Sequence, residues 1–276
     1  EVLRTRFAAV DGEARQIIAD EFGLPFTAHD LTGLANEAKA IEVERLMREE
    51  AARPFDLSAD LMLRVRWLQL AEDVHLIVYT LHHIASDGWS RVILQRELSQ
   101  LYAAYCKGEP DPLPPLTIQY ADYAVWQRQW LEGEVLERAM SYWKTQLADL
   151  PAVHSLPLDK PRPAQQRHVG RTHRLLIGSK LAAGIAELNR QHNTTLFMFM
   201  HTAFALLLSR CSGERDIVVG GTITGRTHRD VEGLIGFFIN DLALRLQIKG
   251  APGFTELLKQ HRETVLDAYA HRHVPF

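Results

Sequence analysis

A proline-rich stretch divides the 276-residue chain into two parts. Residues 151–170 contain Pro151, Pro157, Pro161 and Pro163 and show no helical periodicity. Because proline fixes its own φ angle and restricts the residue before it, this stretch is predicted to be a stiff, extended linker. Strand-like and helix-like runs occur on both sides of it. The sequence therefore predicts a mixed α/β chain with two lobes, residues 1–150 and 171–276.

The first lobe contains two strand-like runs followed by helices. Residues 61–67 alternate apolar side chains with Met62, Arg64 and Arg66, which is typical of a half-exposed strand. Residues 74–83 are apolar on both faces apart from His75, so they are predicted to form a central strand. An apolar helical stripe follows directly, and two further helices are expected at residues 120–131 and 134–147.

The second lobe has the same mixture. Residues 196–208 are apolar almost all round, which predicts a buried helix. Strands are expected at 216–224 and 242–249, with a last helix near 254–269. Residues 221–240 carry four small residues and are predicted to cross between the lobes; these residues are Gly221, Gly225, Gly233 and Gly236.

Composition narrows the functional class. The net charge of −3 does not favour binding to nucleic acid or to an anionic membrane. The sequence has no run of about 18 apolar residues and no signal peptide pattern. Cys106 and Cys211 are the two cysteines, as expected for a reducing, cytoplasmic setting. The chain starts at Glu1 without Met and stops at Phe276 inside apparent elements, so we expect a piece of a longer polypeptide.

The residues after the second strand carry the clearest chemistry. Two adjacent histidines, His82 and His83, are followed after three residues by Asp87-Gly88. Imidazole has the side-chain pKa nearest neutrality, so it suits proton transfer. Neighbouring strand residues point to opposite faces, which predicts that one histidine is structural and the other reaches substrate. We expect His83 to be catalytic and His82 to be structural.

Asp87 and Gly88 allow more ordinary explanations. Asp87 directly precedes a predicted helix, where an aspartate normally caps the backbone N–H groups. Gly88 permits a special backbone angle or the close approach of a thin substrate arm. A metal site is not predicted, because adjacent strand histidines point apart and cannot easily close on one ion.

Five segments, in order, resemble the condensation domains of nonribosomal peptide synthetases. The active-site block of that family is similar to Leu81–Ser90. Two residues depart from the family pattern, Asp241 for a common Thr and His273 for a common Asp, and the family's first and last blocks are absent. The other four matching segments are Glu1–Phe7, Tyr120–Trp126, Ile235–Asn240 and His271–Phe276.

The resemblance implies a chloramphenicol acetyltransferase-like fold with two lobes in a V and a tunnel between them. Upstream donor and downstream acceptor carrier proteins would deliver substrates on phosphopantetheine arms, with an adenylation domain adjacent in the same polypeptide. The chain itself would bind no cofactor. The resemblance also implies an ion pair between Asp87 and Arg4, in which both residues have a structural role. The residues expected along the substrate tunnel are Trp89, Ser90, Gly236 and Asn240.

Several functions remain open on the sequence alone. The favoured one is peptide-bond formation between carrier-bound substrates, with His83 acting as a general base or as a hydrogen-bonding anchor. The alternatives are a related epimerization domain, a coenzyme A-dependent acyltransferase and a non-catalytic docking member of the same fold. Asp87-Gly88-Trp89-Ser90 resembles the condensation form more than the epimerization form.

Overall fold

The computed structural model describes residues 1–150, 153–165, 170 and 172–275. It is a mixed α/β structure, as predicted, and its contacts divide the chain into two compact units. Unit 1 comprises residues 1–130 and 224–239, and unit 2 comprises residues 131–223 and 240–276. Residues 131–150 therefore pack with the second unit, whereas they were predicted to belong to the first lobe. The predicted V and tunnel concern the placement of the units and stay predictions.

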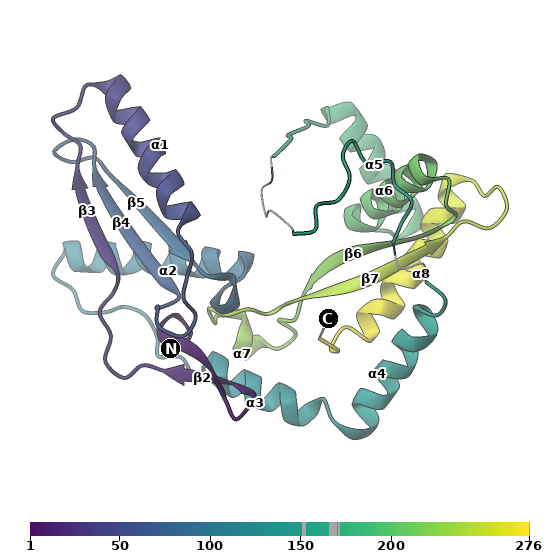
Figure 1. Ribbon diagram of the computed structural model, residues 1–276, viewed down its shortest axis with the longest axis horizontal. Helices are drawn as coiled ribbons and strands as arrows, with labels where there is room; N and C mark the ends of the chain where they lie inside the picture. Colours follow the sequence, from purple (N-terminus) through teal and green to yellow (C-terminus); the bar gives the residue numbers. More distant parts are fainter. Residues whose placement is uncertain (151–152, 166–169, 171, 276) are drawn as a thin grey trace. The chain divides into compact units, whose positions relative to one another are not determined.

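Unit 1 is built around a three-stranded sheet in the order β3-β4-β5 (Figure 1). β3 pairs parallel with β4, and β4 pairs antiparallel with β5. A separate antiparallel hairpin is formed by β1 and β2. The elements of unit 1 are η1 (Val2–Arg4), β1 (Thr5–Val10), β2 (Glu13–Ile18), β3 (Phe26–Asp30), α1 (Asn36–Ala52), β4 (Leu63–Gln69), β5 (His75–Leu81), η2 (His83–Ala85), α2 (Gly88–Cys106), α3 (Tyr120–Trp130) and α7 (Arg229–Glu232).

One prediction for this sheet was wrong. β5 was expected to be central, but β4 holds that position among the described strands. The predicted strand near residues 61–67 is present as β4, and its arginine-bearing face is buried while its other face is half-buried. Arg64 and Arg66 are 3% and 7% exposed because the buried carboxylate of Glu50 on α1 receives a hydrogen bond from each Nε, at 2.6 and 2.7 Å. A binary apolar pattern misassigns such a face because it assumes that charges stay in water.

Unit 2 packs helices against a two-stranded sheet formed by β6 and β7 (Figure 1). Leu242, Leu244 and Leu246 alternate along β7 and are almost completely buried. They lie in cores with residues of α6 and α8 such as Ala205 and Leu258. The elements are α4 (Gly133–Gln146), α5 (Ser179–His192), α6 (Leu196–Ser212), β6 (Asp216–Thr224), β7 (Ile239–Gln247) and α8 (Phe254–Ala270).

Helix α6 differs from its prediction. Met198, His201 and Ala205 on one face are buried, but Phe204 and Leu207 on another are 49% and 56% exposed in the described structure. No single described helix is both long and apolar enough to cross a membrane. The pair α5 and α6 passes that test only together, and the two helices are bent by 104° at their junction.

The predicted linker falls partly outside the described residues, which exclude 151–152 and 166–169. One part that is described docks on unit 2. His154 Nδ1 lies 2.6 Å from a carboxylate oxygen of Glu214, and the N–H of Ser155 donates to the other oxygen of the same carboxylate. This segment is therefore held by specific hydrogen bonds to the Glu214 carboxylate.

Candidate active site

The two histidines lie in a tight turn and not in the strand itself. β5 ends at Leu81, and His82 is the N-cap of the 3₁₀ turn η2 that begins at His83. The different surroundings of the two rings therefore arise from the cap and the turn, and not from the strand alternation that the prediction assumed. The expectation that the two rings do different work does not depend on that alternation.

His82 is engaged in holding the turn. Its Nδ1 accepts the N–H of Ile84 at 3.0 Å, and its carbonyl accepts the hydroxyl of Ser86. Its ring packs edge-on against Phe55, with centroids 5.4 Å apart. Burial lowers the pKa of His82, and the neighbouring charge of His83 lowers it further. A neutral, locally bonded imidazole of this kind fits a structural role.

His83 is exposed and lies at a cavity of about 320 Å³. Its ring meets Phe237 edge-on at a centroid distance of 5.4 Å, so one side of the imidazole is supported by an aromatic surface. The side chain thus reaches open space from a turn that the hydrogen bonds of His82 and Ser86 hold. The other residues that line the cavity are Tyr79, Leu81, Ser86, Asp87, Gly88 and Arg91.

Asp87 caps α2, as the sequence predicted. Its Oδ1 accepts both the N–H and the hydroxyl of Ser90 at 2.7 Å, and its Oδ2 accepts the N–H of Phe238 at 3.1 Å. The carboxylate is 1% exposed. Burial alone would raise the pKa of Asp87, but the Ser90 hydrogen bonds and the charge of Arg226 outweigh it and lower that pKa below its ordinary value.

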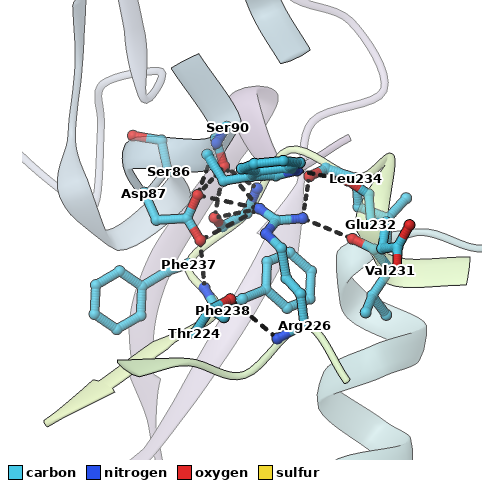
Figure 2. A network of polar contacts seen from close by, with 12 residues as sticks. Ser86, Asp87, Ser90, Thr224, Arg226, Val231, Glu232, Leu234, Phe237 and Phe238 are labelled. Atoms are coloured by element: carbon cyan, nitrogen blue, oxygen red, sulfur yellow. Dashed lines mark hydrogen bonds and ion pairs between the residues drawn. The ribbon is translucent and has the colours of Figure 1, made fainter. Parts of the chain in front are cut away.

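The ionic partner of Asp87 is Arg226, and the predicted pair with Arg4 was wrong. Arg226 Nη2 lies 3.1 and 3.3 Å from the two carboxylate oxygens. Figure 2 shows the two side chains facing each other. Arg4 instead donates to the carbonyl of Ala19 and lies over the ring of Phe22. The resemblance to the family's early block suggested Arg4, but that residue is engaged within the first turn and hairpin of unit 1.

Arg226 is held on several sides. Its Nη1 donates to the carbonyls of Val231 and Leu234 at 2.6 and 2.7 Å, and the guanidinium lies 4.0 Å from the centroid of the Phe238 ring. Burial lowers the pKa of Arg226, although Asp87 acts in the opposite direction. The group is an arginine that stays charged, so a buried, hydrogen-bonded ion pair joins the start of α2 to residues 224–239.

Ser90 is buried and adds further contacts between the start of α2 and residues 224–239. Its hydroxyl accepts the N–H of Gly236 at 3.0 Å and lies 2.8 Å from the Gly236 carbonyl. A hydroxyl has one proton, so it donates either to that carbonyl or to Asp87 at any moment. Ser90 was predicted to line a substrate tunnel, and its contacts instead give it a structural task within unit 1.

Gly236 is a close-packing position. A Cβ at this residue would overlap the rings of Tyr120 and Phe238. The small residues Gly221 and Gly225 also lie against other groups, as predicted, whereas a Cβ at Gly233 would meet nothing within 4 Å. The close approach at Gly236 is therefore to an aromatic side chain, and its predicted place along a substrate tunnel remains a prediction.

The remaining predicted residues have contacts of their own. Trp89 is 55% exposed and donates its indole N–H to the carbonyl of Glu232 at 3.0 Å. Asn240 belongs to unit 2, where its amide donates to the carbonyls of Arg272 and Val274. The unusual Asp241 accepts the hydroxyl of Thr222 at 2.6 Å. Among the described residues, no three His, Cys, Asp or Glu side chains lie together in a way that could hold a metal ion.

The sequence did not predict Arg226. It stands 139 residues after Asp87, so no periodicity connects the two. Two weak signals were present. A capping aspartate that is also buried requires a cation nearby. Arg226 directly follows a run of small and strand-forming residues. That requirement does not choose among the arginines of the chain.

Comparisons with known proteins show the family of this chain. The family model described as "Condensation domain" matches residues 1–276. One of the linear gramicidin synthase proteins of Brevibacillus parabrevis is 45% identical over 276 residues, covering 100% of this chain and 5% of the relative. Malpibaldin synthetase of Mortierella alpina is 44% identical over 277 residues, again covering 100% and 5%. The chain thus spans about one twentieth of the length of these relatives.

A solved structure extends the likeness to the fold. The X-domain from teicoplanin biosynthesis superposes with a TM-score of 0.89 at 28% identity, covering 100% of this chain and 61% of that one. A complex of that X-domain with OxyB has also been solved. The fold is that of the chloramphenicol acetyltransferase-like class. Within that class, the chain belongs to the condensation domains of nonribosomal peptide synthetases.

Proposed function

We propose that this domain forms peptide bonds between carrier-bound substrates. The observation that carries the proposal is an exposed imidazole, His83, at a cavity beside a turn that is fixed by a buried ion pair. The family to which the chain belongs supports the reaction class. The amine of a downstream aminoacyl group would attack the carbonyl of an upstream acyl or peptidyl thioester.

The reaction balances without an outside reagent. The new C–N bond forms as the C–S bond breaks, and the proton lost by the amine is taken up by the departing thiolate. As a general base, His83 would carry that proton and contribute roughly 10²–10⁴ in rate. As an anchor, it would orient the amine or stabilise the tetrahedral intermediate by a hydrogen bond. An α-amino group titrates near about 7.7–8.0, so part of it is already neutral, and both roles stay open.

Asp87 supports the site and does not transfer protons in this proposal. Its two oxygens accept bonds from Ser90, Phe238 and Arg226, and its lowered pKa keeps it ionised. A carboxylate so committed has no free lone pair directed at substrate. It would hold the first turn of α2, and with it the cavity wall next to His83.

The cofactor and partners follow from the family. Phosphopantetheine arms on upstream and downstream carrier proteins would bring the thioesters, so this chain would need no cofactor of its own. An adenylation domain adjacent in the same polypeptide would load the acceptor carrier. A cytoplasmic location, predicted from cysteine usage, accompanies this proposal.

The test is dipeptide formation by a synthetase module that carries this domain. His83→Ala should lower transfer at least about 100-fold if His83 acts as the general base. His83→Asn separates the two roles, because it keeps a hydrogen-bonding group but cannot act as a base near neutral pH. Activity retained by Asn and lost by Ala would identify an anchor, and loss in both would identify a base. His75→Ala, which changes an exposed histidine on β5, is the matched control. Transfer above a tenth of wild type in His83→Ala would remove His83 from the essential role, and a wild-type module that forms no dipeptide from loaded carriers would reject the proposed function.

A docking platform is the second candidate, because the similar X-domain has been solved in a complex with OxyB. In that case the domain would bind another enzyme without making a bond. Loaded carriers that yield no dipeptide with wild-type protein, together with unaltered partner binding by His83→Ala, would favour the platform. Transfer from an acyl-coenzyme A without a carrier would favour a free acyltransferase, and inversion of the donor α-carbon would favour an epimerization domain.

A further inference from the structure

Arg91 lines the same cavity as His83. It is the fourth residue of α2, and its side chain is exposed. Within the described residues, no hydrogen bond or ion pair engages its guanidinium. The arginine five residues further along α2, Arg96, lies 3.9 Å from the carboxylate of Glu97 and does not line this cavity. Arg91 therefore keeps its charge and its donors available at the site.

The rest of the cavity does not neutralise that charge. Asp87 is its one acidic residue among the described ones, and its carboxylate is already paired with Arg226 and bonded to Ser90 and Phe238. The other polar side chains that line the space are His83, Tyr79 and Ser86. Of these, the Ser86 hydroxyl donates to the carbonyl of His82. The cavity thus presents a cation and hydrogen-bond donors, which together favour an oxyanion.

We propose that Arg91 makes the His83 cavity select substrates with a side-chain carboxylate, such as an aspartyl or glutamyl group. The proposal rests on the proposed function and adds the substrate class. In a carrier-bound aminoacyl group the α-carboxyl is tied up as the thioester, so a side-chain carboxylate is the anion that remains near the reacting carbonyl. A guanidinium binds such a group with two parallel hydrogen bonds. The arm's phosphate is the other oxyanion available, but it lies at the opposite end of the arm from the thiol and hence away from His83.

The experiment measures binding and transfer on the same proteins. Small thioesters of N-acetylcysteamine, which lack the phosphate, are compared as an isosteric pair, aspartyl against asparaginyl. Calorimetry uses the unreactive amide analogue of each, in which nitrogen replaces sulfur. 4′-Phosphopantetheine is titrated separately. The proteins are the synthetase module with wild-type sequence, Arg91→Ala, Arg91→Lys and the control Arg96→Ala.

Wild type and Arg96→Ala should bind the aspartyl analogue about tenfold more tightly than the asparaginyl one, a difference that suits one charge-assisted contact. Arg91→Ala should abolish that ratio, chiefly through KM in the transfer assay, and Arg91→Lys should keep part of it. Equal binding of both analogues by wild type, or an unchanged ratio in Arg91→Ala, would overturn the proposal. The proposal would also be overturned if Arg91→Ala bound 4′-phosphopantetheine more weakly but kept the aspartyl-to-asparaginyl affinity ratio, because Arg91 would then bind the arm. A wild-type module that binds selectively but transfers nothing would defeat the proposed function and leave this inference standing.

Discussion

The two units bury ionisable groups in opposite ways. Unit 1 buries charged groups beside opposite charges: Asp87 beside Arg226, and Glu50 between Arg64 and Arg66. Unit 2 buries two histidines, His201 and His261, whose rings stack at 4.6 Å. Their ring nitrogens are buried without a hydrogen bond of normal geometry to any described residue, although the Val219 backbone near His201 partly offsets the effect of burial on its pKa. Removing one partner of a buried ion pair should therefore destabilise unit 1, whereas protonation of the buried neutral rings should destabilise unit 2.

Removal of Arg226 should have the largest effect on stability. Arg226→Met would leave the Asp87 carboxylate buried and unpaired, which should cost about 3–5 kcal/mol of unfolding free energy. Chemical denaturation of the variant measures this. The double variant Asp87→Asn with Arg226→Met should recover a large part of the loss, since no buried charge would remain. Additive losses in the double variant would show that the two groups do not act as a pair.

Glu50→Gln should come next, at about 3 kcal/mol, because Arg64 and Arg66 would then lack their shared carboxylate inside the protein. Part of the cost should be relieved by backbone carbonyls that already accept from these guanidiniums, those of Arg53 and Pro54 among them. Glu49→Gln is the matched control, since its side chain is 53% exposed. That control should change stability by less than about 1 kcal/mol. Equal losses in both variants would mean that burial of Glu50 is not what matters.

Between pH 6.5 and 4, acid should destabilise unit 2 more than unit 1. Burial lowers the pKa of His261 to about 4, with a further contribution from His201, and burial also lowers the pKa of His201. A depressed folded-state pKa means that stability is complete above the ordinary value of 6.5 and is lost as pH falls from there toward about 4. The loss for His261 alone should reach at most about 3 kcal/mol. In unit 1 the pKa of His82 is also lowered, so its protonation below 6.5 should weaken the turn that it caps, but this ring is less deeply buried than that of His261. The lowered pKa values of Asp87 and of Glu50 act only below their ordinary values near 4.

Hydrogen exchange followed by peptide locates this effect. Between pH 6.5 and 4, peptides from α6 and α8 should lose protection first after correction for intrinsic rates, and His261→Phe should remove most of that change. If the β3–β5 sheet loses protection first, the comparison between the units is wrong.

The sequence predicted the local features of this site better than the contacts between residues that are distant in the chain. The cap by Asp87, the helix at residues 88–106 and the apolar alternation of β7 follow from spacing within a few residues, so local patterns suffice. The Arg226 partner and the buried face of β4 depend on which distant carboxylate or arginine approaches in the fold. Likewise, the reason for glycine at position 236 is the ring of Tyr120, far away in the chain. No local sequence pattern predicts contacts between residues so far apart in the chain.

The central claim is that His83 performs chemistry while the Asp87–Arg226 pair performs support. One measurement tests it directly: the dipeptide transfer rate and the unfolding free energy, determined on the same samples of His83→Ala and Asp87→Asn. We predict that His83→Ala loses transfer at least about 100-fold with an unfolding free energy within about 0.5 kcal/mol of wild type. Asp87→Asn should lose stability and keep measurable transfer wherever it remains folded. A folded Asp87→Asn protein of normal stability that transfers nothing, beside an active His83→Ala, would contradict this division of roles.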